Sequence, residues 1–292
     1  MRLPVTDHVT IFEMSPRDGL QNEARPIPTS DKIKLVDLLS RTGLHKIEVA
    51  SFVNPKAVPQ MADGADVMAG IARNSAIKYT ALTPNMRGFE NALRVKPDEI
   101  AVFASASEGF SQANIRCSIA ESLERFRPVL DAAIQAQIPV RGYVSCVADC
   151  PYDGPVLPVD VARVAARLME MGCYEISLGD TIGTGTPETI RRMLDEVSGA
   201  VPIQQLAGHF HDTKGYAIAN IKTSLDAGLR TFDASVGGLG GCPFAPGAAG
   251  NVATEAVVEM LHEAGFSTGI DPERLSEAAN FAKSLRGSNE HA

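Results

Sequence analysis

The chain of 292 residues contains no tryptophan, and aromatic residues make up only 5% of it. Its formal net charge is -8, so the basic, aromatic-rich surface that binds nucleic acid is missing, and nucleic acid is not an expected partner. No apolar run approaches the roughly 18 residues of a membrane span, and the N-terminus MRLPVTDHVT lacks the apolar core of a signal peptide. These absences predict a cytoplasmic protein that does not enter a membrane.

Paired cysteines are also missing from the sequence. The 5 cysteines form an odd number and include no C-x-x-C pair. They are Cys117, Cys146, Cys150, Cys173 and Cys242. In a long chain with an ordinary share of hydrophobic residues (45%), this usage indicates reduced thiols in a cytosolic enzyme rather than a disulfide scaffold.

Short runs rich in Val, Ile, Phe and Tyr recur along the chain and alternate with segments of helical periodicity. In DKIKLVDLLSRTG, for example, Ile33, Val36 and Leu39 share one face and Gly43 supplies a stop. Another helix is expected to start at Thr186-Pro187-Glu188, a capping hydroxyl followed by a first-turn proline and a carboxylate. The strand-like runs occupy residues 8–15, 45–51, 77–83, 99–105, 138–145, 173–179, 203–211 and 230–236.

Eight strand-helix units of about 30 residues favour a closed (β/α)8 barrel, the TIM-barrel class of α/β fold, over an open doubly wound sheet. We find no linker, so residues 1–292 are expected to form a single domain. The segment NVATEAVVEMLHEAG predicts the last barrel helix, and DPERLSEAANFAKSL predicts an extra C-terminal helix beyond it.

The segment HFHDT places His209 and His211 at the end of the seventh predicted strand. Alternate side chains of a strand point to the same face, so both imidazoles are expected to project together. An isolated H-x-H pair is weak evidence for a metal, so other polar residues must converge on the same place.

Polar residues do gather at the carboxyl ends of the predicted strands, where barrel enzymes have their active sites. Each also has a structural explanation: a surface ion pair for Arg17 with Asp18, a turn cap for Asp180 and a helix cap for Asn251. Their shared position at one rim favours a common cavity. The set comprises Arg17, Asp18, Gln21, Glu48, Ser51, Tyr143, Ser145, Ser177, Asp180, His209 and His211, with Asn251 after the eighth strand.

Asp18, His209 and His211 are the expected ligands of a metal ion, and Asn251 is the expected fourth. Two imidazoles, a carboxylate and an amide oxygen form a mixed set that suits magnesium or manganese. Zinc is less favoured because no thiolate pair accompanies these residues.

The glycine-dense segment from Gly237 to Pro243 resembles a phosphate-binding loop but follows the eighth strand, and Pro243 occupies the last glycine position of the dinucleotide fingerprint. We therefore interpret it as a mobile loop with Cys242 at its tip.

Seven segments in order resemble the 3-hydroxy-3-methylglutaryl-CoA lyases. The Arg-Asp-Gly and H-x-H motifs are shared with a wider group of metal-dependent lyase and synthase barrels, whereas the SFVNPK segment and the cysteine-bearing glycine loop are narrower. The segments are SPRDGLQNE, EVASFVNPKAVPQM, FASASEGFSQANI, RGYVSCVADCPYDG, SLGDTIGTGTP, HFHDTKG and GGLGGCPFAPGAAGN.

The resemblance implies cleavage of an acyl-CoA substrate to acetoacetate and acetyl-CoA, with a divalent cation bound by the four predicted ligands. It implies that Arg17 contacts the thioester carbonyl and that Cys242 lies on a loop that closes over the substrate. It places Glu48 and Asp180 near the catalytic arginine and the metal-bound oxygens. Gln21, Ser51, Tyr143 and Ser177 are expected to bind substrate, and a homodimer is suggested.

The base that removes the alcohol proton stays open among Asp18, Asp180, His211 and a metal-bound water. Two other functions also stay open. One is a synthase that condenses acetyl-CoA with a 2-keto acid on the same metal, although such enzymes generally carry a further domain and this chain ends soon after its eighth predicted strand. The other is a non-catalytic barrel that binds a metal or acyl-CoA.

Overall fold

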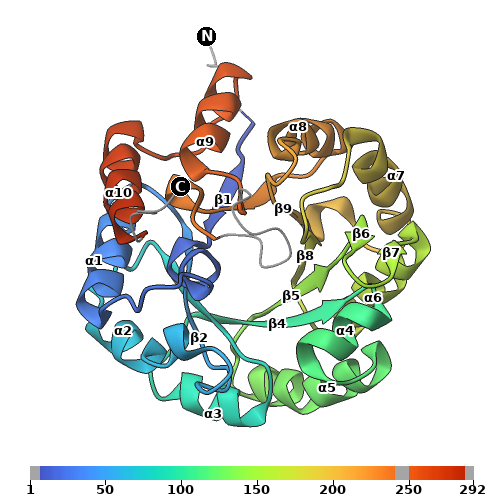
Figure 1. The fold of residues 1–292 in the computed structure, drawn as a ribbon, viewed down its shortest axis with the longest axis horizontal. Coiled ribbons are helices and arrows are strands. Elements are labelled where there is room, and N and C mark those ends of the chain that lie inside the picture. The colour runs from blue at the N-terminus through green and yellow to red at the C-terminus, as the bar shows by residue number, and fades with distance from the viewer. Residues whose placement is uncertain (1–6, 241–249, 287–292) are drawn as a thin grey trace.

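Residues 7–240 and 250–286 are described in a computed structural model of the chain. Eight parallel strands close into a barrel in the order β1-β10-β9-β8-β5-β4-β3-β2, and helices surround it (Figure 1). The predicted (β/α)8 class is therefore confirmed. The barrel strands are β1 (Thr10–Glu13), β2 (Lys46–Ser51), β3 (Lys78–Leu82), β4 (Glu99–Ser105), β5 (Val140–Ser145), β8 (Glu175–Asp180), β9 (Leu206–Phe210) and β10 (Thr231–Ala234).

The helices follow the strands in the expected alternation, and the predicted start of α7 is confirmed: the Thr186 hydroxyl accepts from the Thr189 N–H. They are α1 (Thr29–Leu39), α2 (Gly64–Gly70), α3 (Met86–Leu93), α4 (Glu108–Ile115), α5 (Ile119–Gln135), α6 (Pro158–Glu170), α7 (Pro187–Val197), α8 (Ala217–Ala227), α9 (Thr254–Glu263) and α10 (Pro272–Leu285). Among the described helices, none combines the length and apolar character needed to cross a bilayer.

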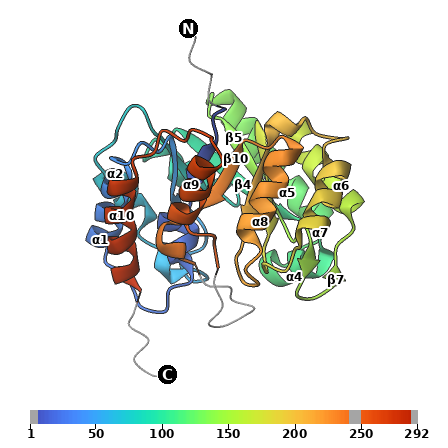
Figure 2. The ribbon, with the colours of Figure 1, turned by 90° about the horizontal axis from the view of Figure 1, so that it is seen from above.

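The extra C-terminal helix is confirmed as α10, which packs against α1 and so lies beside the first unit of the barrel (Figures 1 and 2). Short elements decorate the carboxyl ends of the strands: a π-helix η1 (Ser15–Gly19), a 3-10 turn η4 (Val236–Gly238) and a small hairpin of β6 (Asp149–Cys150) and β7 (Gly154–Pro155). Two further 3-10 turns are η2 (Pro59–Met61) and η3 (Ile203–Gln205).

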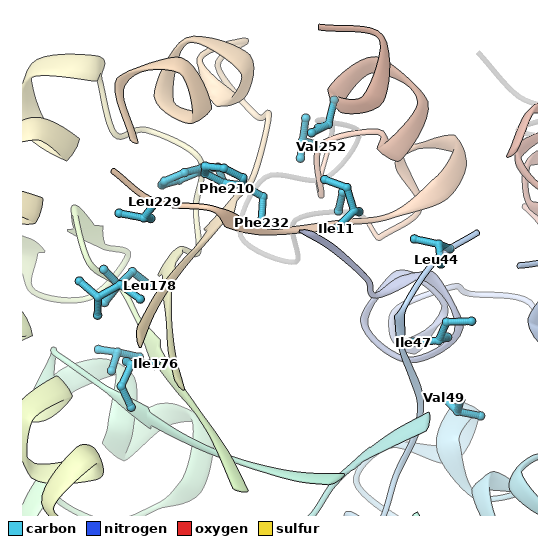
Figure 3. Close-up of a cluster of buried hydrophobic side chains, with 14 of the residues drawn as sticks. Ile11, Leu44, Ile47, Val49, Ile176, Leu178, Phe210, Leu229, Phe232 and Val252 are labelled. Atoms are coloured by element: carbon cyan, nitrogen blue, oxygen red, sulfur yellow. The ribbon is translucent and has the colours of Figure 1, made fainter. Parts of the chain in front are cut away.

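Strand alternation divides the side chains between two environments. Ile176 and Leu178 on β8 point outward to the helices, as does Phe210 on β9 (Figure 3). Because successive side chains of a strand point to opposite faces, Ser177 and His209 point into the barrel. The apolar residues thus form the layer between strands and helices, and the polar residues between them are directed inward.

One detail of the seventh strand was predicted wrongly. The run at 203–211 begins with the helical turn η3, and β9 ends at Phe210, so His211 lies just beyond the strand. His211 instead forms an isolated bridge with Asn251, and the Asp212 N–H donates to the Gly250 carbonyl at 2.7 Å. The chain after β10 therefore pairs with this end of β9 and fixes the position of His211.

Candidate active site

A cavity of about 520 Å³ opens at the carboxyl ends of the strands. Several predicted site residues lie outside its lining: Glu48, Ser51, Asp180 and Asn251 are buried behind it. Cys242 lies outside the described residues. The predicted residues that line the cavity are Arg17, Asp18, Gln21, Tyr143, Ser145, Ser177, His209 and His211.

Asp18, His209 and His211 form a cluster in which one potential ligand atom from each lies within 4.8 Å of the other two. Asp18 comes from η1 and the histidines come from the end of β9, so barrel closure brings them together. Asn251 contacts this cluster, because its Nδ2 donates to the Oδ2 of Asp18 at 2.7 Å. The helix-cap explanation for Asn251 is wrong, since α9 starts at Thr254 and its flanking residue is Ala253.

Two glycines allow the close approach of chain segments at this cluster. A Cβ on Gly19 would lie 2.7 Å from the Ser235 Oγ, so the glycine of the Arg-Asp-Gly motif lets η1 pack against the residues after β10. Gly240 has a φ of +98°, and a Cβ there would lie 2.6 Å from the Nδ2 of Asn251. Both positions therefore require glycine for the observed packing.

The protonation states of the cluster fit a divalent cation. Burial, together with the nearby charge of His209, lowers the pKa of His211 to about 4, so its imidazole is neutral at pH 7. Its Nδ1 is buried and has no hydrogen-bond partner among the described residues. Burial opposes the ionisation of Asp18, but the charges of Arg17 and the histidines hold its pKa well below the usual range. The cluster thus offers the Asp18 carboxylate and a neutral His211 imidazole, both of which can bind a divalent cation.

Asp233 supports His209 from below the cavity, a contact that we did not predict. Its Oδ2 lies 3.1 Å from the Nδ1 of His209 and accepts from the Ser177 hydroxyl at 2.7 Å. Burial disfavours protonated His209, yet the hydrogen bond and charge of Asp233 raise its pKa. A charged residue within the apolar strand RTFDASV was the available signal.

Arg17 is held by two carboxylates. Its Nε donates to Glu48, and its Nη1 donates to the Oδ1 of Asp18 at 2.6 Å. Arg17 is only 6% exposed, so the surface ion-pair explanation is wrong. Within the described part of the chain these contacts leave Nη2 unengaged, and the guanidinium lines the cavity. It can therefore donate to a ligand oxygen there.

Glu48 is itself held by a hydrogen bond from another strand of the barrel. The Tyr143 hydroxyl donates to its Oε1 at 3.1 Å. Burial raises the pKa of Glu48, and the adjacent Arg17 opposes that rise. Glu48 thus orients Arg17 from behind instead of facing the cavity.

Asp180 acts on the turn that follows β8. Its Oδ2 accepts from the Gly185 N–H at 2.9 Å, as the turn-cap explanation expects, and burial raises the pKa of its carboxyl to about 6. Ser51 is buried at the end of β2, and its hydroxyl has no partner among the described residues.

A second unpredicted carboxylate, Glu13, ties together the segments that flank the site. Its Oε1 accepts from the N–H groups of Ser15 and Val236, both at 3.0 Å. Its Oε2 accepts from the Thr254 hydroxyl at 2.7 Å. Because these partners precede Asp18 and bracket Asn251, Glu13 fixes the backbone from which both side chains extend.

Comparison with known proteins shows that the chain is similar to 3-hydroxy-3-methylglutaryl-CoA lyases over nearly its whole length. The family model described as HMGL-like matches residues 8–282. A lyase from Pseudomonas aeruginosa named 3-hydroxy-3-isohexenylglutaryl-CoA/hydroxy-methylglutaryl-CoA lyase is 58% identical over 95% of this chain and 92% of its own length.

Two solved structures are also similar over almost the whole chain. The HMG-CoA lyase from Brucella melitensis superposes with a TM-score of 0.95 at 61% identity, covering 96% of this chain and 99% of its own. An HMG-CoA lyase from Acinetobacter baumannii, solved with coenzyme A and 3-methylmalate, gives a TM-score of 0.91 at 35% identity, covering 100% and 99% of the two chains.

Proposed function

The chain belongs to the HMGL-like family, and from this membership and the site geometry we propose that it cleaves 3-hydroxy-3-methylglutaryl-CoA to acetoacetate and acetyl-CoA. The observation that carries the proposal is the placement of Arg17 and the cluster of Asp18, His209 and His211 on one cavity wall. The reaction must remove a proton from a tertiary alcohol and stabilise the enolate that departs, so it needs two electrophilic groups side by side.

Asp18, His209, His211 and Asn251 are the residues that would hold the ion, magnesium or manganese. Such an ion, when bound, lowers the pKa of the substrate alcohol and fixes its orientation. Arg17 is permanently charged, and its unengaged Nη2 can donate to the thioester oxygen as negative charge develops there. Glu48 and Asp18 hold the guanidinium in place, so little reorganisation is needed during the reaction.

Two proton transfers complete the proposed reaction. Asp18 and His211 line the cavity and Asp180 does not, which favours the first two as routes for the alcohol proton. Cys242 is proposed to deliver a proton to the enolate carbon and to help exclude water.

The direct test is incubation with 3-hydroxy-3-methylglutaryl-CoA and magnesium, followed by assay of acetoacetate. Absence of acetoacetate would overturn the proposal. Release of free thiol from acetyl-CoA and a 2-keto acid would instead identify a condensing synthase, and ligand binding without turnover of either substrate would identify a non-catalytic barrel.

A second candidate substrate carries a longer alkyl group at carbon 3, as in the name of the Pseudomonas aeruginosa relative. An apolar wall favours it: Leu82, Phe103 and Phe126 line the cavity on the β3–β4 side, across the barrel from β9. Comparing kcat/KM for the methyl and isohexenyl thioesters tests this candidate. A large preference for the methyl substrate would exclude it.

A further inference from the structure

A buried network of side chains, of which only Tyr143 lines the cavity, connects the predicted metal ligands to Arg17. It consists of Asp233, Arg141, Tyr143 and Glu48, all of which are at most 8% exposed. These residues lie on β10, β5 and β2, so the network crosses the inside of the barrel. Replacing a buried ion network by well-packed apolar residues is often neutral or stabilising, so stability alone does not account for this arrangement.

At one end, Asp233 determines which nitrogen of His209 carries a proton. The Arg141 guanidinium lies against both oxygens of Asp233, at 2.8 Å and 3.0 Å, and the Ser177 hydroxyl donates to Oδ2 at 2.7 Å, so Asp233 is a carboxylate that can only accept. The Nδ1 of His209, 3.1 Å from Oδ2, must therefore be the donor. This leaves Nε2, which lies 4.0 Å from the Oδ2 of Asp18, as the nitrogen directed at the cluster.

In the middle, Arg141 joins the two halves of the network. Its Nη1 donates to the Oδ2 of Asp233 at 3.0 Å and to the Tyr143 hydroxyl at 3.2 Å. Its Nη2 lies 2.8 Å from the Oδ1 of Asp233, and its Nε donates to Glu175 at 2.7 Å. The guanidinium also lies 4.5 Å from the centre of the Phe12 ring. Arg141 is thus fixed on several sides.

At the other end, the Tyr143 hydroxyl donates to Glu48, and Glu48 accepts from the Nε of Arg17. A path of side-chain contacts therefore runs from His209 through Asp233, Arg141, Tyr143 and Glu48 to Arg17. The path joins a predicted metal ligand, His209, to Arg17, which is proposed to stabilise the negative charge that develops on the thioester oxygen.

We propose that Asp233 and Arg141 are positioning residues: Asp233 fixes the tautomer of His209 that presents Nε2 to a metal ion, and Arg141 links this orientation, through Tyr143 and Glu48, to that of Arg17. Residues that orient metal-binding histidines typically change metal affinity or activity 10- to 100-fold when altered. The inference rests on the proposed function only for the identity of the reaction, because its first test measures metal binding.

Asp233→Asn is the informative variant. An amide has one acceptor and one donor group, and Asp233 faces nitrogen atoms of His209 and Arg141 with both oxygens. Either orientation of asparagine therefore places its NH2 group against a nitrogen donor. We expect the Kd for Mn²⁺, measured by electron paramagnetic resonance, to rise at least tenfold. A smaller rise in folded protein would overturn the role of Asp233.

The matched control is Glu99→Gln, which neutralises another buried carboxylate at the opposite end of the barrel. Glu99 lies 3.3 Å from the Nζ of Lys46 and accepts from the Tyr174 hydroxyl at 2.7 Å. Its loss should lower the unfolding temperature and leave the Mn²⁺ Kd unchanged. A tenfold rise in Kd here as well would mean that general loss of stability, not positioning, explains the Asp233 result.

A further test uses the wild-type protein and does not require Asp233→Asn to fold. With ¹⁵N-labelled histidine, the metal-free protein at pH 8 should show a protonated Nδ1 and an unprotonated Nε2 for His209, assigned by comparison with His209→Gln. The opposite tautomer would overturn the proposal.

Tyr143→Phe tests the link to Arg17. Loss of a hydrogen bond to a charged group should lower kcat about tenfold, with KM and the Mn²⁺ Kd unchanged. A raised KM with unchanged kcat would make Tyr143 a substrate-binding residue and overturn the link. If the wild-type protein fails to cleave the proposed thioester, the function fails while the metal-affinity and tautomer measurements still decide the role of Asp233.

Discussion

Replacement of Arg17 by glutamine should nearly abolish turnover while the protein still folds. Glutamine removes the guanidinium that lines the cavity and with it the Nη2 donor that the described contacts leave unengaged. It also removes the partner of Glu48, whose carboxylate then keeps the Tyr143 hydroxyl as a donor. The substitution thus affects the rate and the stability by separate routes.

The loss of rate follows from the donor. Removing one preorganised donor to a developing oxyanion typically costs about 10²–10³ in kcat, or about 3–4 kcal/mol. The loss of stability follows from Glu48. Breaking a buried ion pair costs about 3–5 kcal/mol, but burial already raises the pKa of Glu48, so it can take up a proton and limit that cost.

The assay measures kcat and KM for 3-hydroxy-3-methylglutaryl-CoA beside thermal unfolding. The double variant Arg17→Gln/Glu48→Gln removes the orphaned carboxylate, so it should regain stability without regaining rate. Arg73→Gln serves as the second control. Arg73 forms an ion pair of 2.6 Å with Asp98, and neither residue lines the cavity. A folded Arg17→Gln protein with wild-type turnover would refute the reasoning.

Three further predictions concern the ion, the loop and pH. Stripping metal with a chelator should abolish cleavage, and magnesium or manganese should restore it; full activity of stripped protein would contradict the site. Cys242→Ser should lower the rate far more than metal affinity, and an unchanged rate would assign Cys242 a structural role. Burial raises the pKa of Asp180 to about 6, so its charge destabilises the fold as pH rises from about 4 through 6. Asp180→Asn should therefore be more stable than wild type at pH 8, by up to about 3 kcal/mol, and the gain should vanish near pH 4; equal gains at both values would refute this.

The barrel was predictable because its signal is local. Each apolar run and each helical segment can be recognised within about 15 residues, and eight repeats leave few alternatives. The end of β9 was not predictable in this way, since the bridge between His211 and Asn251 joins residues far apart in sequence.

The rim residues were predictable once the strands were recognised, because barrel enzymes carry their functional groups at the carboxyl ends of the strands. The supporting residues were missed because their partners lie on other strands. Glu13, Arg141 and Asp233 each stand within an apolar strand run, and charged residues there should have been assigned partners inside the fold. Arg141 meets Asp233 inside the barrel only because closure brings β5 and β10, which are not neighbours in the sheet, within reach of each other.

The cluster spans the place where the ring of strands is completed, because Asp18 follows β1, whereas His209, His211 and Asn251 come from the chain around β9 and β10. During synthesis Asp18 is made long before His209, His211 and Asn251. A nascent or truncated chain that lacks the last two strands therefore has the guanidinium and carboxylate of η1 but no imidazoles beside them. The cluster proposed to hold the ion is therefore complete only in the finished barrel.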